Sequence, residues 1–290
     1  MADKSLINLE KEVSEARKGN RVALETIVRA VQKDIYNLAI RFLWSPQDAE
    51  DATQEILIKI ITGLDGFRSE SSFRTWVYRV ACNTLLTLSK KRMEQQGFTF
   101  EAFGNDLADG LSDELPNLED EVEMALLIEE VKIGCTLAML MCLNREQRMA
   151  YILGEILDLD QYEAAEILAI STDSFRKRLS RAKQAIMAFM LGHCGLVESA
   201  NPCRCNSRLG TAIKLGRVQP KRLNFAVSLV QAKGFPEVLA MIRQLEDTRR
   251  IAQLYRSHPQ PEPSDAFIAW LRALLDEMPS LKDQQVVSLH

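Results

Sequence analysis

Residues 45–92 hold the side chains with the clearest binding chemistry in this chain. An acidic helix face is followed by a polar loop flanked by Phe67 and Phe73, and then by a helix that ends in basic residues. Residues 73–92 contain five basic residues and no acidic one. Carboxylates suit a basic protein partner, whereas basic and aromatic side chains suit a nucleic acid. The segment therefore predicts a protein that brings a larger machine to DNA.

A second motif with nucleic-acid chemistry spans residues 157–186. Asp160 and Glu163 have the spacing of a capping box, and Ser171 or Thr172 begins a second helix after a short turn. This pattern is typical of a helix-turn-helix, whose second helix enters the major groove, although a solvated basic helix in an ordinary bundle has similar residues. The side chains expected to face outward are Ser174, Arg176, Lys177, Arg178, Arg181 and Lys183.

A third cluster contains His193, Cys194, Cys203 and Cys205. Histidine and thiolate are zinc ligands, but two adjacent donors, an eight-residue gap and a C-x-C pair differ from the usual spacing of structural zinc sites. A disulfide from Cys194 to Cys203 or Cys205 is the redox alternative, because nearby arginines favour thiolate. Ordinary structural use in a turn is the third interpretation. Apart from zinc at this cluster, no cofactor is expected.

Helices position all of these residues. Apolar residues recur at steps of three and four, and we find neither an alternating strand pattern nor an Asn-Gly hairpin. Ser45, with Pro46 after it, begins the helix that carries the acidic face, and a loop at 63–72 precedes the next helix. We predict an all-α fold of two small helical domains with a helical C-terminal extension.

Charge and punctuation divide the chain into four parts. Residues 98–123 contain nine acidic residues and no basic one, and the glycines and proline among them are typical of a linker. We expect a first domain at 1–96, an acidic flexible linker at 97–120, a second domain at 121–192 and a cysteine-containing extension at 193–290.

The composition is that of an ordinary globular protein. With 290 residues, 47% hydrophobic and 26% charged, the chain is long enough for about two domains. The net charge of −4 is an average over strongly acidic and strongly basic segments, so local charge decides the partner. No export signal begins the chain, and no apolar run approaches the length of about 18 to 20 residues needed for a membrane span. We expect a cytoplasmic protein without membrane insertion.

The two halves together resemble bacterial RNA polymerase sigma factors of the sigma-70 family, extracytoplasmic-function group. The first half is similar to their region 2 in DAEDATQEILIKI and FRSESSFRTWVYRVACN. The second is similar to their region 4 in NREQRMAYILGEILDLDQYEAAEILAISTDSFRKRLSRAK. Both occur in the family's order within about residues 15–192, which is more specific than either motif alone.

The resemblance implies a function without catalysis. A sigma factor binds core RNA polymerase, directs it to the −35 and −10 elements of a promoter, and helps to melt the −10 element. The partners expected are therefore core RNA polymerase and promoter DNA. A free-standing helix-turn-helix regulator that acts without polymerase is the alternative. An oxidoreductase built on the cysteines would need a strand-helix redox context or a cofactor loop, and we find neither.

The resemblance also implies contact residues. The acidic helix face corresponds to the family's docking face for the clamp helices of the largest polymerase subunit, at Asp48, Asp51, Gln54 and Glu55. The −10 surface corresponds to Phe67, Arg68, Ser71, Phe73, Arg74, Asn83, Lys90, Lys91 and Arg92. The −35 surface corresponds to Thr172, Ser174, Arg176, Lys177, Arg178 and Arg181.

The extension beyond residue 192 departs from the minimal two-region pattern of the group. Further helices are expected at 220–256 and 264–278, separated by three prolines. We hypothesise that this extension regulates the protein by folding back on its DNA-binding or polymerase-binding surfaces, or by receiving an inhibitory partner protein. The amphipathic last helix and the basic, cysteine-bearing segment before it motivate this hypothesis.

Overall fold

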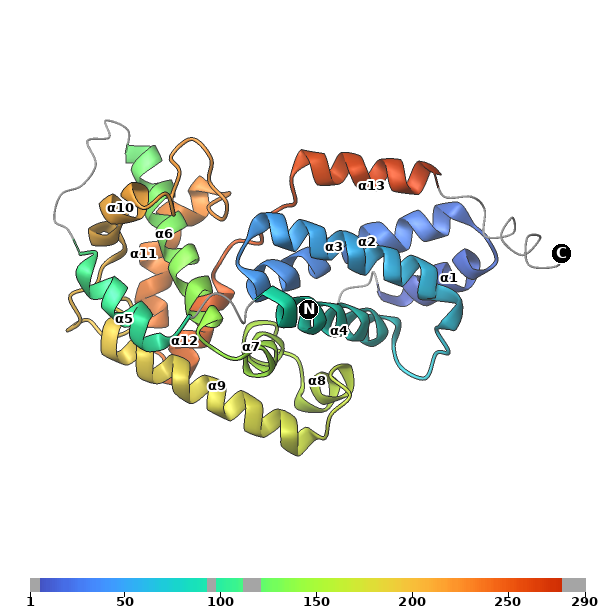
Figure 1. Ribbon diagram of the computed structural model, residues 1–290, viewed down its shortest axis with the longest axis horizontal. Coiled ribbons are helices and arrows are strands. Elements are labelled where there is room, and N and C mark those ends of the chain that lie inside the picture. Colours follow the sequence, from blue (N-terminus) through green and yellow to red (C-terminus); the bar gives the residue numbers. More distant parts are fainter. Residues whose placement is uncertain (1–5, 93–97, 112–120, 278–290) are drawn as a thin grey trace.

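The computed structural model describes residues 6–92, 98–111 and 121–277, and within these residues every regular element is a helix (Figure 1). The all-α prediction is confirmed. The elements are α1 (Leu6–Arg17), α2 (Arg21–Leu43), α3 (Pro46–Gly63), η1 (Leu64–Gly66), α4 (Phe73–Arg92), α5 (Phe100–Asp109), α6 (Glu121–Met141), α7 (Arg145–Tyr151), the π-helical turn η3 (Ile152–Ile156), α8 (Gln161–Ile167), α9 (Thr172–His193), α10 (Cys205–Lys214), α11 (Leu229–Ile242), α12 (Asp247–Arg256) and α13 (Asp265–Glu277). None of the described helices combines the length and apolar composition needed to cross a bilayer.

Helices α1 to α4 form the first lobe around an apolar core. Asn20 and Ser45 cap α2 and α3, each through a side-chain oxygen that accepts a backbone N–H bond of 3.2 Å. Pro46 occupies the first position of α3, as predicted. The stripe expected to be buried on α2 is buried, at Leu24, Ile27, Val28, Val31, Ile35, Leu38 and Phe42. This packing leaves Asp51 of α3 and Asn83 of α4 exposed.

Helices α8 and α9 form the predicted helix-turn-helix. An Asp160 carboxylate oxygen accepts from the Tyr162 N–H at 2.7 Å and begins α8. The Ser171 hydroxyl accepts from the Ser174 N–H at 3.2 Å and begins α9. Ala164 of α8 is fully buried, and its small side chain allows the two helices to approach closely. The expected caps at Asp160 and Ser171 are confirmed.

The prediction of a flexible linker at 97–120 is wrong for residues 100–109, which form α5. The Thr99 hydroxyl caps this helix by accepting from the Ala102 N–H at 3.1 Å. Phe100 and Phe103 pack on Phe189 of α9, with ring centroids 5.2 and 5.5 Å apart. The acidic composition of the segment suggests a linker, but it also contains two aromatic residues at helical spacing. Their packing on Phe189 holds α5 in place. Residues 97 and 112–120 of the predicted linker lie outside the described part of the chain.

The acidic charge of this segment is matched within the molecule. Asp106 of α5 pairs with Arg217 at 2.7 Å and with Arg208 at 3.0 Å, both from the basic part of the extension. The hydrogen bonds and charge of Arg217, supported by Arg208, lower the pKa of Asp106. The acidic and basic segments therefore neutralise each other at this contact.

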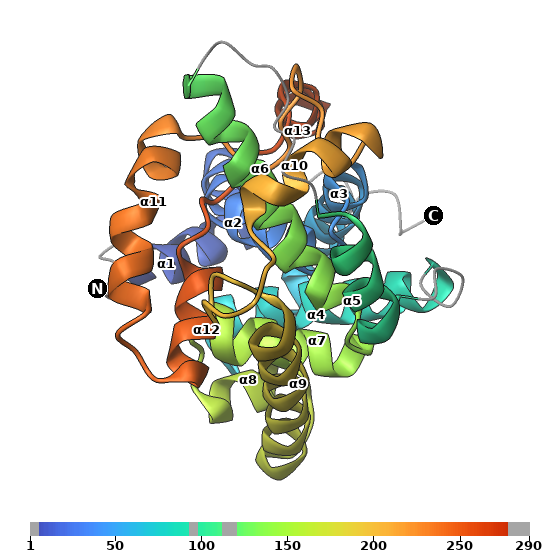
Figure 2. The same ribbon diagram turned by 90° about the vertical axis from the view of Figure 1, so that its left-hand side faces the viewer.

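The extension packs around α6 and α9: α10 and α11 lie against α6, whereas α12 lies against α9, η3 and α11 (Figure 2). The prediction of a single helix at 220–256 is wrong. The structure has two helices in this range, since α11 runs from Leu229 to Ile242 and α12 begins at Asp247. The helix expected at 264–278 is confirmed as α13. It lies on α2 and α3 of the first lobe, although more than 200 residues separate it from these helices in the sequence (Figure 1).

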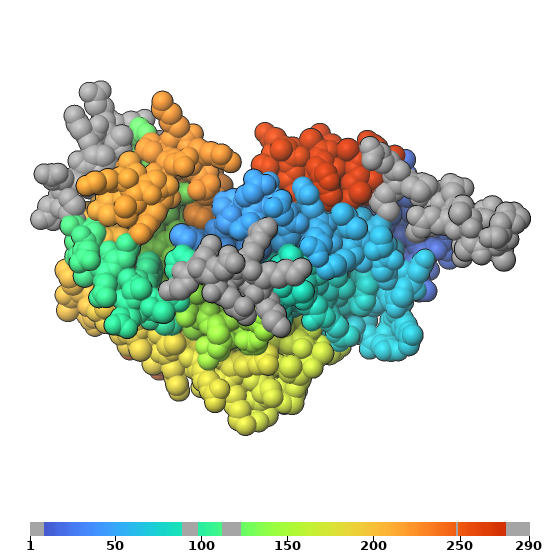
Figure 3. All heavy atoms as spheres, in the orientation of Figure 1, coloured from blue at the N-terminus to red at the C-terminus, as the bar shows by residue number. Residues whose placement is uncertain are grey.

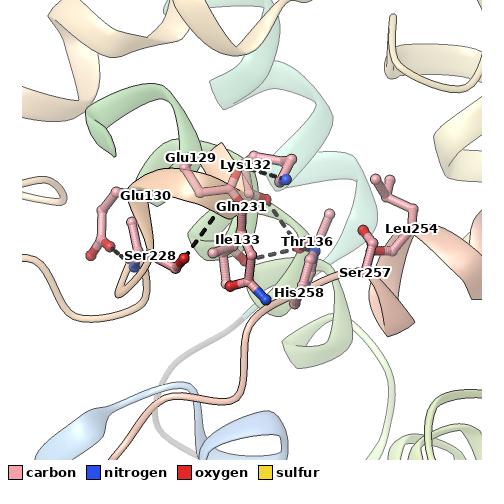
Figure 4. Close-up of polar contacts among 11 residues, drawn as sticks. Glu129, Glu130, Lys132, Ile133, Thr136, Ser228, Gln231, Leu254, Ser257 and His258 are labelled. Carbon is pink, nitrogen blue, oxygen red and sulfur yellow. Dashed lines mark hydrogen bonds and ion pairs between the residues drawn. The ribbon is translucent and has the colours of Figure 1, made fainter. Parts of the chain in front are cut away.

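Buried polar groups join α6 to the extension (Figure 4). The Glu130 carboxylate accepts the backbone N–H groups of residues 224, 225 and 226 at 2.7 to 2.8 Å. Thr136 and His258 are hydrogen-bonded at 3.2 Å, and Tyr255 donates to the Thr136 carbonyl at 2.9 Å. Burial lowers the pKa of His258 well below its usual value, so the ring is neutral. Residues 224–258 are therefore an integral part of the second lobe.

Candidate functional site

The acidic face of α3 is assembled as the sequence predicted. Asp48, Asp51, Gln54 and Glu55 lie on one side of the helix, away from the buried Ala49 and Ala52 stripe. Asp51 is exposed and the other three are partly buried. Glu55 forms an ion pair of 2.6 Å with Lys59, one turn further along. A row of carboxylates on one helix face is electrostatically complementary to a basic helical partner.

An apolar residue on this face escaped the sequence analysis. Ile58 is 43% exposed and lies seven residues after Asp51, which places both on the same stripe of α3. An exposed isoleucine beside carboxylates would add an apolar contact to this face if a partner covered it. The heptad spacing to Asp51 is the signal that could have revealed it.

The two phenylalanines predicted to contact DNA are buried, and this corrects the prediction. Phe67 and Phe73 are 4% and 3% exposed and pack with Trp76, with ring centroids 5.5 to 5.7 Å apart. A buried aromatic cluster fixes the loop between η1 and α4, but its rings cannot stack on a base in this conformation. Arg68 is exposed and Ser71 is partly exposed on the same loop, so these two remain available.

The structure places Arg74 and Asn83 on opposite sides of α4. Nine residues separate them, which is about half a turn beyond two full turns. Arg74 lies over the Tyr78 ring at 5.4 Å and lines a cavity of about 330 Å³ between α2 and α4, together with Asp34. Asn83 is exposed on the other side. Arg74 is exposed as well, so the two residues are accessible from different sides of α4 and do not form one continuous strand-binding face.

Arg79 lies one turn before Asn83, and sequence reasoning missed its contact with the second lobe. Its guanidinium donates to the carbonyl and the carboxylate of Glu166 in α8, at 3.1 and 3.3 Å. The helix-turn-helix therefore lies against the helix that carries Asn83. The side chains of Lys90, Lys91 and Arg92, in the last turn of α4, lie outside the described residues.

The outer face of α9 collects the predicted basic residues. Arg176, Lys177 and Arg181 are exposed, and Thr172, Ser174 and Arg178 are partly buried. Arg176 donates to Gln161 at 2.6 Å and Lys177 pairs with Asp173 at 2.7 Å. These contacts are local and solvent-facing, so a phosphate can replace them at small cost. The face has the position and charge of a helix that enters a major groove.

Comparison with known proteins decides the family. Residues 27–94 match the protein family described as "Sigma-70 region 2", and residues 133–186 match the family described as "Sigma-70, region 4". The RNA polymerase sigma-H factor of Pseudomonas aeruginosa is 31% identical over 182 residues, which cover 60% of this chain and 89% of that protein. The chain belongs to the extracytoplasmic-function sigma factors.

Two further similarities accompany this family membership. The ECF RNA polymerase sigma-E factor of Escherichia coli K12 is 30% identical to this sigma factor over 178 residues, which cover 60% of this chain and 90% of that protein. A solved structure of CnrH in complex with the cytosolic domain of CnrY is 21% identical, with a TM-score of 0.44, and covers 62% of this chain and 96% of that chain. The region 4 match ends at residue 186 of this sigma factor, so neither family match reaches the extension that begins at residue 193.

The cysteine cluster of the sigma factor differs from the predicted set. The His193 ring is exposed, stacks on Phe189 at 4.6 Å and faces Gly104 of α5. Cys194 and Cys203 are neighbours through a backbone bridge, and Cys205 follows at the start of α10. Among the described residues, no three His, Cys, Asp or Glu side chains are arranged to hold a metal ion. Zinc at this cluster therefore stays a prediction.

A fourth thiol lies near this cluster. Cys135 of α6 lies in the neighbourhood of Cys194, Cys203 and Cys205, and burial together with these neighbours raises its pKa. Burial also raises the pKa of Cys194 and of Cys203. Burial therefore favours the protonated form of these thiols in this conformation. Sequence reasoning missed Cys135 because α6 is distant in the sequence from the other three.

Proposed function

We propose that this sigma factor binds core RNA polymerase through the acidic face of α3, directs it to promoters and helps to open the −10 element. The observation that carries the proposal is the order of surfaces along one chain. A carboxylate face on α3 stands next to the exposed Asn83 face of α4, and a basic recognition helix follows on α9. One protein can therefore hold polymerase and both promoter elements.

The roles fall to residues that the structure leaves accessible. Asp48, Asp51, Gln54 and Glu55, with Ile58, form the proposed docking face. Arg68, Ser71 and Asn83 form the proposed −10 surface, and Phe67 and Phe73 support its loop from within. The proposed −35 surface consists of Thr172, Ser174, Arg176, Lys177, Arg178 and Arg181.

We infer that the sigma factor acts by binding alone, in the cytoplasm, where polymerase and DNA are found. The named relatives are sigma factors, which supports a role in initiation rather than a catalysed reaction. The free-standing regulator is less favoured, because it would use α9 and leave the acidic face of α3 without a purpose.

Replacing Arg178 by alanine should weaken promoter binding by the holoenzyme about tenfold, since one lost base or phosphate contact costs about 1 to 3 kcal/mol. The measurement is the Kd for a duplex promoter fragment, determined with core polymerase present and repeated at two salt concentrations. Gln184→Ala is the matched control, because Gln184 is exposed on the same helix beyond the proposed surface. Equal affinity of the Arg178→Ala and Gln184→Ala holoenzymes would remove Arg178 from the −35 surface.

A further inference from the structure

The end of the extension joins the two lobes. We call residues 257–277 the clasp; it runs from the end of α12 on the second lobe to α13 on the first. At the second-lobe end, Arg256 donates to the Glu155 carbonyl and pairs with Asp158, both at 2.7 Å. His258 is buried against Thr136 of α6. This end of the clasp is therefore fixed by buried and charged contacts.

At the first-lobe end, α13 lies along α2 and α3 (Figure 3). Its apolar side is buried at Phe267, Leu271 and Leu275, which are 1% to 5% exposed. We call the contact of these three side chains with α2 and α3 the seat of α13. Ion pairs flank the seat: Arg21 pairs with Asp276 at 2.9 Å and Lys33 pairs with Glu262 at 2.5 Å. Because exposed ion pairs contribute little, the three apolar side chains supply most of the binding free energy of the seat.

The seat borders the proposed docking face. The Ser264 N–H donates to the Glu50 carboxylate of α3 at 2.7 Å. Glu50 lies one helical turn before Gln54, and residues four apart are neighbours on a helix surface. A polymerase helix that covers Asp51 and Gln54 therefore reaches the edge of α3 that the start of the clasp occupies.

The lobes also contact each other directly, which gives a closed arrangement. Arg79 of α4 donates to Glu166 of α8, and the Cys82 thiol lies 3.5 Å from the Met149 sulfur. The −35 and −10 elements are separate segments of one promoter, and each base-pair step between them adds about 3.4 Å along B-DNA. Lobes of this size have radii of about 18 Å, so lobes in contact reach only elements whose centres lie within about ten base-pair steps of each other.

The connection within the clasp is too short to follow this separation. Residues 257–264 join α12 to α13 and span at most about 30 Å when fully extended. Lobes placed on elements more than about 20 base-pair steps apart are separated by a gap wider than this reach. Either α13 leaves the first lobe or α12 leaves the second. The chain from α4 to α5 is also short, so α5 must leave α9 as well.

We propose that α13 is an intramolecular competitor of core polymerase: together with the direct contacts between the lobes it holds the sigma factor closed, and it is displaced from α2 and α3 when polymerase binds. The proposal rests on the proposed function, since polymerase is the displacing partner. The second-lobe end of the clasp stays in place because His258 forms a buried hydrogen bond to Thr136 of α6, whereas α13 is held mainly by the apolar contacts of one helix face. Docking on α3 and opening of the lobes are then one coupled event.

The test compares two double variants of the full chain that add the same charge to α13. Phe267→Asp with Leu271→Asp places two carboxylates in the seat, whereas Ala269→Asp with Ala273→Asp places them on the exposed side of the same helix. Amide hydrogen exchange of α13 is measured in the free protein, and Kd is measured for core polymerase. We expect fast exchange of α13 and about tenfold tighter core binding for the seat variant only.

Three results would overturn the proposal. Unchanged or weaker core binding of the seat variant would show that α13 does not compete with polymerase. Unchanged exchange of α13 in that variant would show that the apolar face does not hold the helix. Equal gains in both variants would assign the effect to added charge. Failure of the proposed function is separate, because the unaltered protein would then not bind core polymerase at all, whatever the exchange of α13.

Discussion

Replacing both Asp51 and Glu55 by lysine is expected to weaken binding to core RNA polymerase about a hundredfold or more. Reversing two charges at a complementary interface introduces like-charge contacts that cost several kcal/mol, and about 2.8 kcal/mol already corresponds to a hundredfold change in Kd. The fold should survive, because Asp51 is exposed and the Glu55–Lys59 pair is about half exposed on both sides. A surface pair of this kind contributes about 0 to 1 kcal/mol.

The affinity is measured with purified core polymerase at physiological salt, alongside thermal unfolding of each variant. The control carries the same charge change elsewhere: Glu237→Lys with Glu246→Lys, two exposed carboxylates of the extension. Core binding close to that of the unaltered protein is expected for this control. A docking variant that still binds core with full affinity would show that α3 does not carry the polymerase contact.

Replacing Arg148 by methionine should destabilise the protein by about 3 to 5 kcal/mol, since it removes a charged, fully satisfied group from the interior. Arg148 is fully buried, and burial lowers its pKa to about 10, so the side chain is still charged at neutral pH. Its guanidinium donates, at 2.8 to 3.1 Å, to the carbonyls of Phe42, Leu140, Met141 and Leu143. Methionine fills the space but leaves these carbonyls without a donor.

Urea unfolding followed by circular dichroism measures this loss. Arg145→Met is the control, because Arg145 lies one turn earlier on α7, is partly exposed and forms an ion pair with the neighbouring Glu146 at 2.9 Å. We expect a change of less than about 1 kcal/mol for the control. Similar unfolding midpoints for the two variants would mean that the buried hydrogen bonds of Arg148 do not hold α7 to α2.

Local signals predicted much of this fold because they depend on neighbouring residues. The caps at Ser45, Asp160 and Ser171 and the buried stripe of α2 follow from side chains within one or two turns. The acidic face of α3 and the basic face of α9 followed from helical spacing in the same way. The family resemblance then assigned roles that spacing alone cannot give.

The misses came from contacts between distant parts of the chain. The acidic residues of α5 predict a flexible linker, whereas its packing on Phe189 depends on a contact that the local sequence does not report. Phe67 was expected at the DNA surface, but the aromatic cluster with Trp76 exists only once η1 and α4 are folded together. The seat of α13 on α2 joins residues more than 200 positions apart, and no local pattern reports such a contact.

The most direct test of the account is transcription by purified core polymerase from a pool of genomic fragments, with and without the sigma factor, followed by mapping of the transcript 5′ ends. The account predicts defined start sites that depend on the sigma factor, share upstream −35 and −10 sequences, and disappear with the Asp51→Lys and Glu55→Lys variant. Sequence-specific binding to duplex DNA by the protein alone, without any new transcript when core polymerase is added, would contradict it.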